Sequence, residues 1–400
     1  LIRLHGSYQQ DDRDVREERR RRKLEPAWSF MVRLRLPGGV CTPAQWLAVD
    51  AIARQYGGGA LRLTTRQTFQ FHGIAKGHLK ATMQALDAAL LDTIAACGDV
   101  NRNVIASANA VESPVFAEVA EAAHALAGHL LPQTRAWHEI WLDGEKLVGE
   151  PEPEPLYGKS FLPRKFKTAI AIPPLNDVDL FAQDLGFIAI VEDGRLAGYN
   201  LTVGGGMGAT HGDPATYPRL ADVAGFLPPE RLLAVAEAVM TTQRDFGDRT
   251  NRKHARLKYT IADRGLDWFV GEVNRRVGVP LEPARPFRFD SHHDRFGWQR
   301  DADGAYHLTL RIPSGRIVDR DDRPWLTGLR EIARVHRGHF RITPNQNLIL
   351  AGIAPEDRAA IGQLVARHAL ETGERQAPLL RDALACVALP TCPLAMAEAE

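Results

Sequence analysis

The sequence is poor in cysteine, in long apolar segments and in net charge. Four cysteines in 400 residues are too few for the disulfide framework of a secreted protein, which favours a reducing compartment. The N-terminus shows no basic-then-apolar signal segment, and no apolar run is long enough to cross a bilayer. A formal net charge of +1 indicates neither nucleic acid nor a membrane as the partner. We therefore expect a cytoplasmic protein.

The rest of the composition is that of an ordinary globular protein, with 44% hydrophobic and 25% charged residues. At roughly 100 to 200 residues per domain, the length predicts two to four domains. The chain begins with leucine and ends in a helical pattern, PLAMAEAE, without a stop signal. We therefore expect a fragment that is truncated at both ends.

An internal repeat is the most informative feature of the chain. LRLTTRQTFQFHGI at 61–74 matches FRITPNQNLILAGI at 340–353. Identical pairs include Arg62/Arg341, Thr64/Thr343, Gln67/Gln346 and Gly73/Gly352. VRLRLPGG at 32–39 likewise matches LTLRIPSG at 308–315, and each leads to a helical stretch that contains Ile-Ala-Arg. Self-similarity of this kind indicates two copies of one structural unit.

Each copy reads as strand, helix, strand, helix. In the first copy, Thr42 to Gln45 form a capping box with proline at the first helical position, and the helix is expected to reach about Gln55. This order predicts an α+β fold, in which duplicated ferredoxin-like half-units pack about a pseudo-twofold axis, together with an α/β domain. The expected segments are an N-terminal arm at 1–28, the first repeat at 29–106, the α/β domain at 107–290, the second repeat at 291–371, and an incomplete counterpart of the α/β domain at 372–400.

The α/β domain and the end of the second copy have their own patterns. Within the α/β domain we expect helices at 116–131 and 229–244 and strands at 168–173 and 186–193. After the second copy we expect a helix from about Pro355 to Leu370.

Basic residues stand where a core strand normally carries neutral side chains. Arg33 and Arg35 alternate with apolar residues, Arg102 lies between two asparagines, and a cluster precedes the strand at 168. That cluster is Arg164, Lys165 and Lys167. Any one of these cations is most simply explained by a buried ion pair, because long cations are costly to bury unpaired. Six or more together favour an anionic cofactor or substrate, which arginine forks bind well.

Polar side chains also follow one predicted strand. Strand alternation places six of them on the same face: Arg62, Thr64, Arg66, Thr68, Gln70 and His72. A lone histidine in a strand is usually structural. A whole polar face on a half-buried strand is better explained by a large polar ligand with many carboxylates.

Two further patterns carry little weight. The run from Arg16 to Lys23, REERRRRK, resembles a nucleic-acid patch, but its glutamates favour a solvated helix face. The glycine run at Gly204, Gly205 and Gly206 permits close approach of backbone to a ligand, although such a run is more often only a turn.

Cys386 and Cys392 form a C-x5-C pair with prolines nearby. Thiolates at this spacing fit a soft metal such as iron or zinc, and two buried free thiols are the alternative. Cys41 and Cys97 each stand alone. The pair therefore predicts half of a four-cysteine cluster whose other half lies beyond Glu400.

Several motifs together resemble the siroheme-dependent sulfite and nitrite reductase family, and especially its NADPH-dependent members. They are RLTTRQTFQFHG, NRNV, LPRKFKT, VGGG, TTQRDFGDRTNRKHARLKYT, FRITPNQNLILAG and ACVALPTCPLAMAEAE, and they run through the whole chain. The resemblance implies siroheme, an iron tetrapyrrole rich in carboxylates, coupled to a four-iron four-sulfur (4Fe-4S) cluster. It implies the six-electron reduction of sulfite to hydrogen sulfide in sulfate assimilation, with a flavoprotein (alpha) subunit supplying electrons from NADPH.

The resemblance also assigns roles to single residues. It implies sulfite-binding cations that could relay protons, at Arg33, Arg102, Lys165 and Lys167. It implies siroheme contacts at Arg62, Thr64, Arg66, Gln70, His72, Arg164, Gly204, Gly205, Gly206 and Arg256, the last where relatives usually have lysine. Cys386 and Cys392 match the first two cluster ligands, and a Cys-x3-Cys motif further along is implied for the other two.

Alternatives remain open within and outside this enzyme class. A ferredoxin-dependent sulfite or nitrite reductase has the same fold, although lysine at both 165 and 167 favours sulfite. A non-catalytic fragment that binds only a tetrapyrrole or an anion is the alternative from another class. Neither nucleic acid nor a membrane is expected as a partner.

Overall fold

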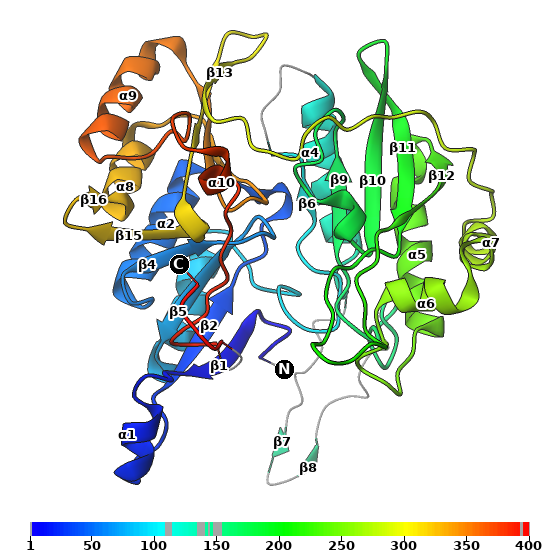
Figure 1. Ribbon diagram of the computed structural model, residues 1–400, viewed down its shortest axis with the longest axis horizontal. Coiled ribbons are helices and arrows are strands. Elements are labelled where there is room, and N and C mark those ends of the chain that lie inside the picture. The colour runs from blue at the N-terminus through cyan, green and yellow to red at the C-terminus, as the bar shows by residue number, and fades with distance from the viewer. Residues whose placement is uncertain are drawn as a thin grey trace.

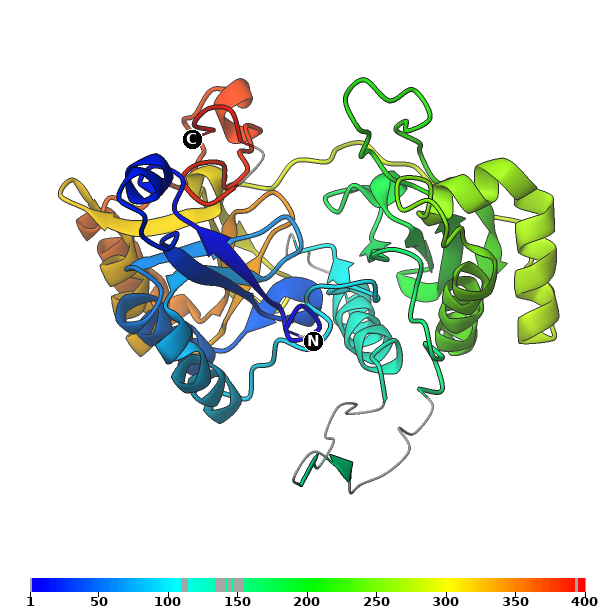
Figure 2. The ribbon, with the colours of Figure 1, turned by 90° about the horizontal axis from the view of Figure 1, so that it is seen from below.

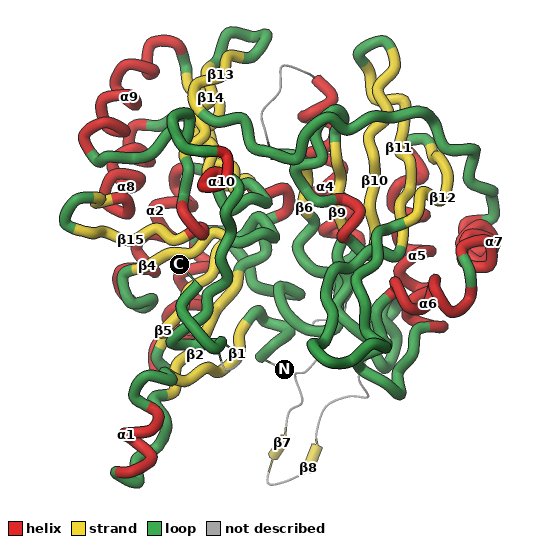
Figure 3. The backbone as a smooth tube through the Cα atoms, in the orientation of Figure 1, coloured by secondary structure: helices red, strands yellow, loops and turns green. Residues whose placement is uncertain are grey.

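The computed structural model describes residues 2–108, 114–133, 141–142, 145–146, 154–392 and 395–399. These residues form two lobes, which lie side by side in Figure 1. One lobe holds both repeats with the N- and C-terminal residues, and the other is the α/β domain. The segment after α7 (Leu266–Val277) crosses between them and leads into β13 (Gly297–Arg300). Much of the chain between the lobes is loop (Figure 3).

The first repeat builds an antiparallel sheet with α2 (Pro43–Gln55) and α3 (Leu79–Ala88). The strand order is β1 (Ser7–Asp11), β2 (Trp28–Arg33), β5 (Phe69–Ile74), β4 (Ala60–Leu63), β15 (Arg316–Arg320) and β16 (Arg323–Pro324). The predicted capping box is confirmed, since Thr42 Oγ1 accepts from the Gln45 N–H at 3.2 Å and Gln45 Oε1 accepts from the Thr42 N–H at 3.0 Å. β1, which we expected in an N-terminal arm, is the edge strand of this sheet.

The second repeat builds a matching antiparallel sheet with α8 (Trp325–Val335) and α9 (Arg358–Arg367). Its strand order is β13, β14 (Tyr306–Leu310), β18 (Leu348–Ile353), β17 (His339–Ile342) and β3 (Val40–Cys41). The repeats exchange strands: β15 of the second pairs with β4 of the first, and β3 of the first pairs with β17 of the second. The reciprocal exchange confirms the predicted duplication.

One hydrophobic core spans both repeats. At its centre Trp46 of α2 stacks on Phe340 of β17, with ring centroids 4.5 Å apart. Beside it, the buried Asp50 accepts from Arg54 at 2.9 Å and from Arg330 of α8 at 3.4 Å. The two copies therefore form one packed unit rather than two separate domains.

The α/β domain contains a mixed sheet in the order β12 (Asp222–Leu227), β11 (Arg195–Val203), β10 (Leu185–Glu192), β9 (Thr168–Ala171) and β6 (Ile105–Ala106). α4 (Pro114–His129) and α5 (Leu232–Phe246) pack against each other on one side of it (Figure 2). The predicted helices and strands of this domain are confirmed. Because β6 pairs with β9, the domain begins before residue 107.

The remaining elements are short. They are α1 (Arg16–Arg21), β7 (Trp141–Leu142), β8 (Glu145–Lys146), α6 (Leu257–Arg264), α10 (Pro378–Arg381), and 3₁₀ helices at Pro37–Gly39, Lys76–His78, Leu180–Ala182, Pro229–Arg231, Pro313–Gly315 and Pro355–Asp357. α1 has no buried residue, and pairs such as Arg20–Glu17 at 2.9 Å confirm the predicted solvated face. None of the described helices has the length and apolarity that a bilayer crossing needs.

Candidate active site

Residues 61–74 form a β-hairpin, so our prediction of a single strand is wrong. β4 and β5 pair antiparallel, with Arg62 opposite Gln70. Thr64 Oγ1 closes the turn between them by accepting from the N–H groups of Arg66 at 3.2 Å and Thr68 at 3.3 Å. Strand alternation does not continue through a turn, so the six polar side chains do not share one face. The hydroxyl oxygen of Thr64 serves the turn, and its contact with siroheme stays a prediction.

Arg66 extends from that turn to the α/β domain. Its guanidinium donates to the backbone oxygens of Asn103 at 3.0 Å and Thr168 at 2.6 Å, and to Gln183 Oε1 at 2.6 Å. Burial lowers the pKa of Arg66 to about 9. All these acceptors are neutral, so the positive charge of Arg66 remains available to an anion.

Residues 96–98 hold the two arginines that we assigned to the substrate. Ala96 O accepts from Arg33 Nη1 at 3.3 Å and from Arg102 Nη1 at 3.0 Å. Arg33 Nη1 also lies 3.1 Å from Cys97 Sγ, and Arg102 Nε donates to Gly98 O at 3.0 Å. Burial lowers the pKa of Arg102, and the charge of Arg33 lowers it further. The fold therefore places both guanidinium groups next to each other.

Lys165 and Lys167 precede β9 and approach the same region. Neither ammonium group forms a hydrogen bond or ion pair with any part of the chain that the structure describes. Burial lowers the pKa of Lys165 to about 8 and that of Lys167 to about 7. Neighbouring arginines lower both pKa values further, chiefly Arg256 for Lys165 and Arg66 for Lys167. Amines with such pKa values can donate protons near neutral pH.

Arg256 is fixed by Asp184, which lies directly before β10. Arg256 Nε donates to Asp184 Oδ1 at 3.0 Å and Nη2 donates to Oδ2 at 2.8 Å. Asp184 is fully buried and also accepts from the Lys167 N–H at 2.9 Å. Burial lowers the pKa of Arg256, but the ion pair with Asp184 outweighs it and the net pKa is raised. The pair orients a permanent cation beside the two lysines.

Arg164 lies at the rim of this group. Its Nη1 is 3.8 Å from Asp99 Oδ1, and Asp99 also pairs with Arg252 at 2.9 Å. Burial lowers the pKa of Arg164, and Arg252 lowers it further. Arg164 is thus attracted by the carboxylate of Asp99 at the rim and repelled by the neighbouring cations.

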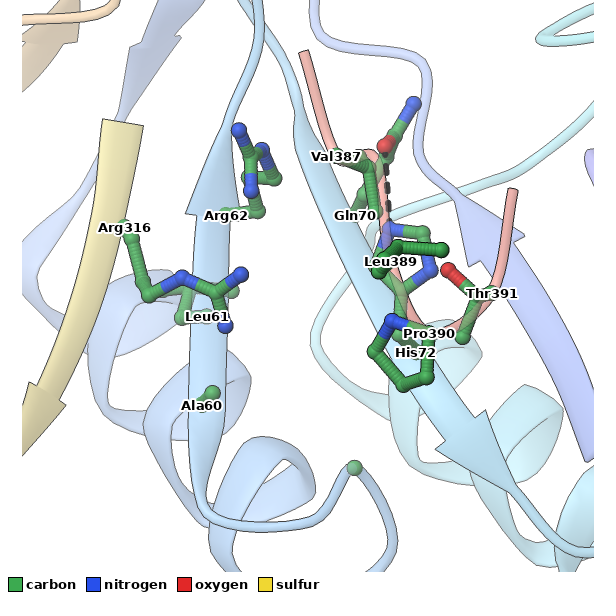
Figure 4. Close-up of a pocket in the computed structure, with 11 residues that line it drawn as sticks. Ala60, Leu61, Arg62, Gln70, His72, Arg316, Val387, Leu389, Pro390 and Thr391 are labelled. Carbon is green, nitrogen blue, oxygen red and sulfur yellow. Dashed lines mark hydrogen bonds between the residues drawn. The ribbon is translucent and has the colours of Figure 1, made fainter. Parts of the chain in front are cut away.

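Arg62, Gln70 and His72 line a pocket on the hairpin, which Figure 4 shows together with Arg316. Residues 387–391 cover this pocket, and Arg62 donates to Ala385 O at 3.1 Å. Burial, followed by the charges of Arg62 and Arg33, lowers the pKa of His72 to about 4. The imidazole is therefore neutral at neutral pH and acts as a hydrogen-bonding group.

The glycine run follows β11 and is tightly packed. The N–H groups of Gly204, Gly205 and Gly206 donate to the backbone oxygens of Asp184, Gln183 and Arg219 at 2.8 to 2.9 Å. A Cβ on Gly205 would lie 2.2 Å from Phe181 O, so only glycine fits there. The backbone donors of this loop are therefore used within the protein, and its contact with siroheme stays a prediction.

Cys386 and Cys392 are free thiols on the C-terminal loop, the first exposed and the second partly exposed. Cys41 and Cys97 are buried, and burial raises the pKa of Cys41, which belongs to the core of the repeats. Two accessible soft donors on one loop fit two ligands of an iron–sulfur cluster. No group of three or more metal-binding side chains occurs within the described ranges.

The balance of charge fits a carboxylate-rich cofactor together with an anionic substrate. Shared acceptors bring cations from both lobes together: Ala96 O accepts from two of them, and Asp184 accepts from a third and from the backbone of a fourth. Their mutual effects on pKa agree with this closeness. These cations are Arg33, Arg66, Arg102, Lys165, Lys167 and Arg256. Asp184 inside the group and Asp99 at its rim are the acidic side chains that lower the repulsion between these cations. Further negative charge from a ligand stabilises such a group.

Sequence reasoning missed the residues that hold these cations. One of them is Asp184. The signal that could have identified it is an acidic residue directly before the apolar segment at 185–191. Asn103 is another, since its Nδ2 donates to Leu36 O at 2.7 Å and to Arg66 O at 2.8 Å. Sequence reasoning also missed Lys258, which holds the glycine loop. It is only 1% exposed and donates to Gly206 O at 3.1 Å and Gly208 O at 2.7 Å, which no local pattern indicates.

Known domain families match most of the chain. Residues 25–89 and 299–368 match the nitrite/sulfite reductase ferredoxin-like half domain, and residues 121–281 match the nitrite and sulphite reductase 4Fe-4S domain. The two half-domain matches coincide with the two repeats. The region matched by the 4Fe-4S domain contains no cysteine, so ligands of a cluster must lie outside it.

Curated relatives match the whole chain. A protein of Myxococcus xanthus, named sulfite reductase (NADPH) hemoprotein beta-component, is 63% identical over 400 residues, which are 100% of this chain and 71% of the relative. A protein of Xanthomonas oryzae pv. oryzae with the same name is 60% identical over 402 residues, again covering 100% of this chain and 71% of the relative.

The solved structure of the Mycobacterium tuberculosis NirA protein superposes with a TM-score of 0.78 at 25% identity, covering 100% of this chain and 67% of that one. This likeness confirms the predicted fold class. Matches to both domain types, together with relatives of this identity, are decisive. The chain belongs to the nitrite and sulfite reductase family.

Proposed function

We propose that this chain reduces sulfite to hydrogen sulfide as the hemoprotein component of an NADPH-dependent assimilatory sulfite reductase. The observation that carries the proposal is the group of half-buried cations around Lys165 and Lys167, whose ammonium groups have no partner among the described residues. Relatives at 60% and 63% identity that bear this name support sulfite as the substrate.

Siroheme and a 4Fe-4S cluster, when bound, would pass electrons from the external donor to the substrate. The residues that would hold siroheme carboxylates are Arg62, Thr64, Arg66, Gln70, His72, Arg164, Gly204, Gly205, Gly206 and Arg256. Cys386 and Cys392 would supply two thiolates to the cluster. Because Cys41 and Cys97 are buried and Cys97 contacts Arg33, we propose that the other two thiolates come from outside these 400 residues.

The four proposed substrate residues have complementary roles. Arg33 and Arg102 carry planar guanidinium forks that match the geometry of an oxyanion, so they bind and orient the sulfite oxygens. Lys165 and Lys167, with lowered pKa values, can donate protons from Nζ to oxygens that leave as water. Binding an anion raises the pKa of each amine, so both lysines take up protons from solvent when the substrate binds.

The electron donor and the compartment follow from the same proposal. A hemoprotein component needs a partner that delivers electrons, and we propose a flavoprotein (alpha) subunit that oxidises NADPH. The four free cysteines fit the reducing cytoplasm. A ferredoxin-dependent sulfite or nitrite reductase is the nearest alternative within the family.

The first test is an absorption spectrum of the protein purified from cells that make siroheme. We expect a Soret band and far-red absorption that change on addition of sulfite, in the form that contains all four cluster ligands. Activity with NADPH and a flavoprotein, against activity with reduced ferredoxin, identifies the donor. A folded protein without any chromophore contradicts the proposal.

A further inference from the structure

The residues from Gln10 to Arg13, at the end of β1, contact the loop that carries Cys392. The backbone N–H of Arg13 donates to Pro390 O at 3.0 Å. Arg13 Nη1 donates to Cys392 O at 2.8 Å and also to Ala395 O. Gln10 Nε2 reaches Thr391 O at 3.5 Å. The N-terminal residues therefore bind the backbone on both sides of a proposed cluster ligand.

The cysteine loop has little regular structure of its own. After the short α10 no helix or strand follows in the described residues, and Leu379, Leu380 and Leu384 are exposed. Within the loop, the Cys392 N–H donates to Ala388 O at 2.9 Å. Figure 1 shows the C-terminal segment crossing over β1 and β2. A loop without a core of its own depends on such side-chain contacts to fix its ligand geometry.

The same strand also reaches a proposed substrate residue. Gln10 Oε1 lies 3.0 Å from His72 Nδ1. With its amide oxygen facing Arg33, Gln70 accepts from Arg33 Nη2 at 2.5 Å and Nε at 2.7 Å, and its amide nitrogen donates to His72 Nε2 at 3.2 Å. A continuous chain of contacts thus runs from Arg33 through Gln70 and His72 to Gln10, three residues before Arg13 in the sequence.

We propose that Arg13 is a positioning residue for the iron–sulfur ligand Cys392. This rests on the proposed function, in which Cys392 ligates the cluster. The guanidinium fixes the carbonyl of the ligand residue, and so the direction of its thiolate. Its positive charge also stabilises the more negative, reduced state of a nearby cluster, because hydrogen bonding and charge around the sulfur ligands set the reduction potential.

The experiment compares Arg13→Ala and Arg13→Lys with Arg20→Ala in the complete, cofactor-loaded protein. Arg20 is a matched control, because it lies on the exposed α1, pairs only with Glu17 in the described residues, and carries the same charge. The readouts are amide hydrogen exchange over residues 386–392, the rate of iron release to a chelator, and the midpoint potential of the cluster followed by electron paramagnetic resonance.

For Arg13→Ala we expect faster exchange, iron release accelerated by roughly 10- to 100-fold, and a lower midpoint potential. Arg13→Lys keeps the positive charge but loses the forked donor. Its midpoint potential should therefore stay closer to the wild-type value than its hydrogen exchange over residues 386–392 does. Arg20→Ala should match the wild type in all three. Exchange and iron release in Arg13→Ala equal to those of the wild type overturn the inference.

Failure of the proposed function is recognised separately. A wild-type protein that contains neither iron nor acid-labile sulfide contradicts the cluster itself. Hydrogen exchange over residues 386–392 needs no cluster, so it tests the contact of Arg13 with the loop in either case.

Discussion

The two repeats carry the same residue types where they contact each other, and different ones where they face the rest of the molecule. Gln67 Nε2 donates to Ile342 O at 3.0 Å, and Gln346 Nε2 donates to Leu63 O at 3.1 Å. Gln67 follows β4 and binds the end of β17, whereas Gln346 follows β17 and binds the end of β4. The two contacts are therefore equivalent in the two copies. Both have positive φ, +51° and +65°, so the same turn is built twice.

The divergent positions lie on the following strand. Gln70 and His72 of β5 correspond to Ile349 and Ala351 of β18, which pack with Ala108. Arg66 corresponds to Asn345. One copy thus uses this face for polar groups that can meet a ligand, and the other uses it to attach the α/β domain. Duplication preserved the scaffold, and the two faces acquired different roles.

The largest effect is expected from Arg66→Ala, compared with Asn345→Ala at the matching position. Arg66→Ala leaves three buried acceptors without their donor, each at a cost of about 1–3 kcal/mol, and removes a cation from the proposed siroheme site. We expect loss of siroheme absorption and of sulfite reduction. Asn345→Ala should lower stability but keep the cofactor. A folded Arg66→Ala protein with normal siroheme content would contradict the assigned difference between the copies.

The next prediction concerns Lys167 of the α/β domain, whose neighbour Arg66 belongs to the first copy. Lys167→Met should lower sulfite reduction by roughly 10²- to 10³-fold, the usual effect of removing one such donor, with the siroheme spectrum kept. Exposed Lys159, replaced by methionine in the same way, serves as the control. Unchanged sulfite kinetics in Lys167→Met would count against an anion site here.

Lys167→Met should also change the pH dependence of stability in the ligand-free protein. The pKa of Lys167 is about 7 in the folded chain against 10.5 unfolded, so the unfolded chain binds more protons between these values. Burial of the charged amine therefore destabilises the fold most below about pH 7, and the penalty vanishes towards pH 10.5. Urea unfolding at several pH values should show Lys167→Met as the more stable protein at low pH, by on the order of 1–3 kcal/mol.

The smallest effect is expected for the two joining glutamines. Gln67→Ala and Gln346→Ala should each lower the free energy of unfolding by about 1–3 kcal/mol, because each leaves two backbone oxygens unpaired. Gln67 should cost more, since its Oε1 also accepts from the Ala106 N–H at 2.9 Å. Exposed Gln363→Ala on α9 should change nothing. If one of the two substitutions lowered the free energy of unfolding and the other left it unchanged, the two glutamines would not have equivalent roles in the two copies.

The candidate site was only partly predictable from the sequence. Arg33, Arg102, Lys165 and Lys167 stand out because cations next to buried strands are unusual, and the fold brings them together. Asp184 and Asn103 do not stand out, because their roles consist of contacts with residues far away in the chain. The single strand predicted at 61–74 failed because a tight turn with Gln67 at positive φ needs no glycine or proline to mark it.

The sequence by itself determined the duplication, the helix α2 with its capping box, and an unusual number of cations next to apolar strands. These are local signals, set by periodicity, capping chemistry and the cost of burying charge. Only the tertiary structure decided the exchange of β3 and β15, the docking of the cysteine loop on Arg13, and which copy packs against the α/β domain with the face of its last strand. Those features depend on pairing between distant segments, and side-chain patterns within one segment do not record the partner on which it will pack.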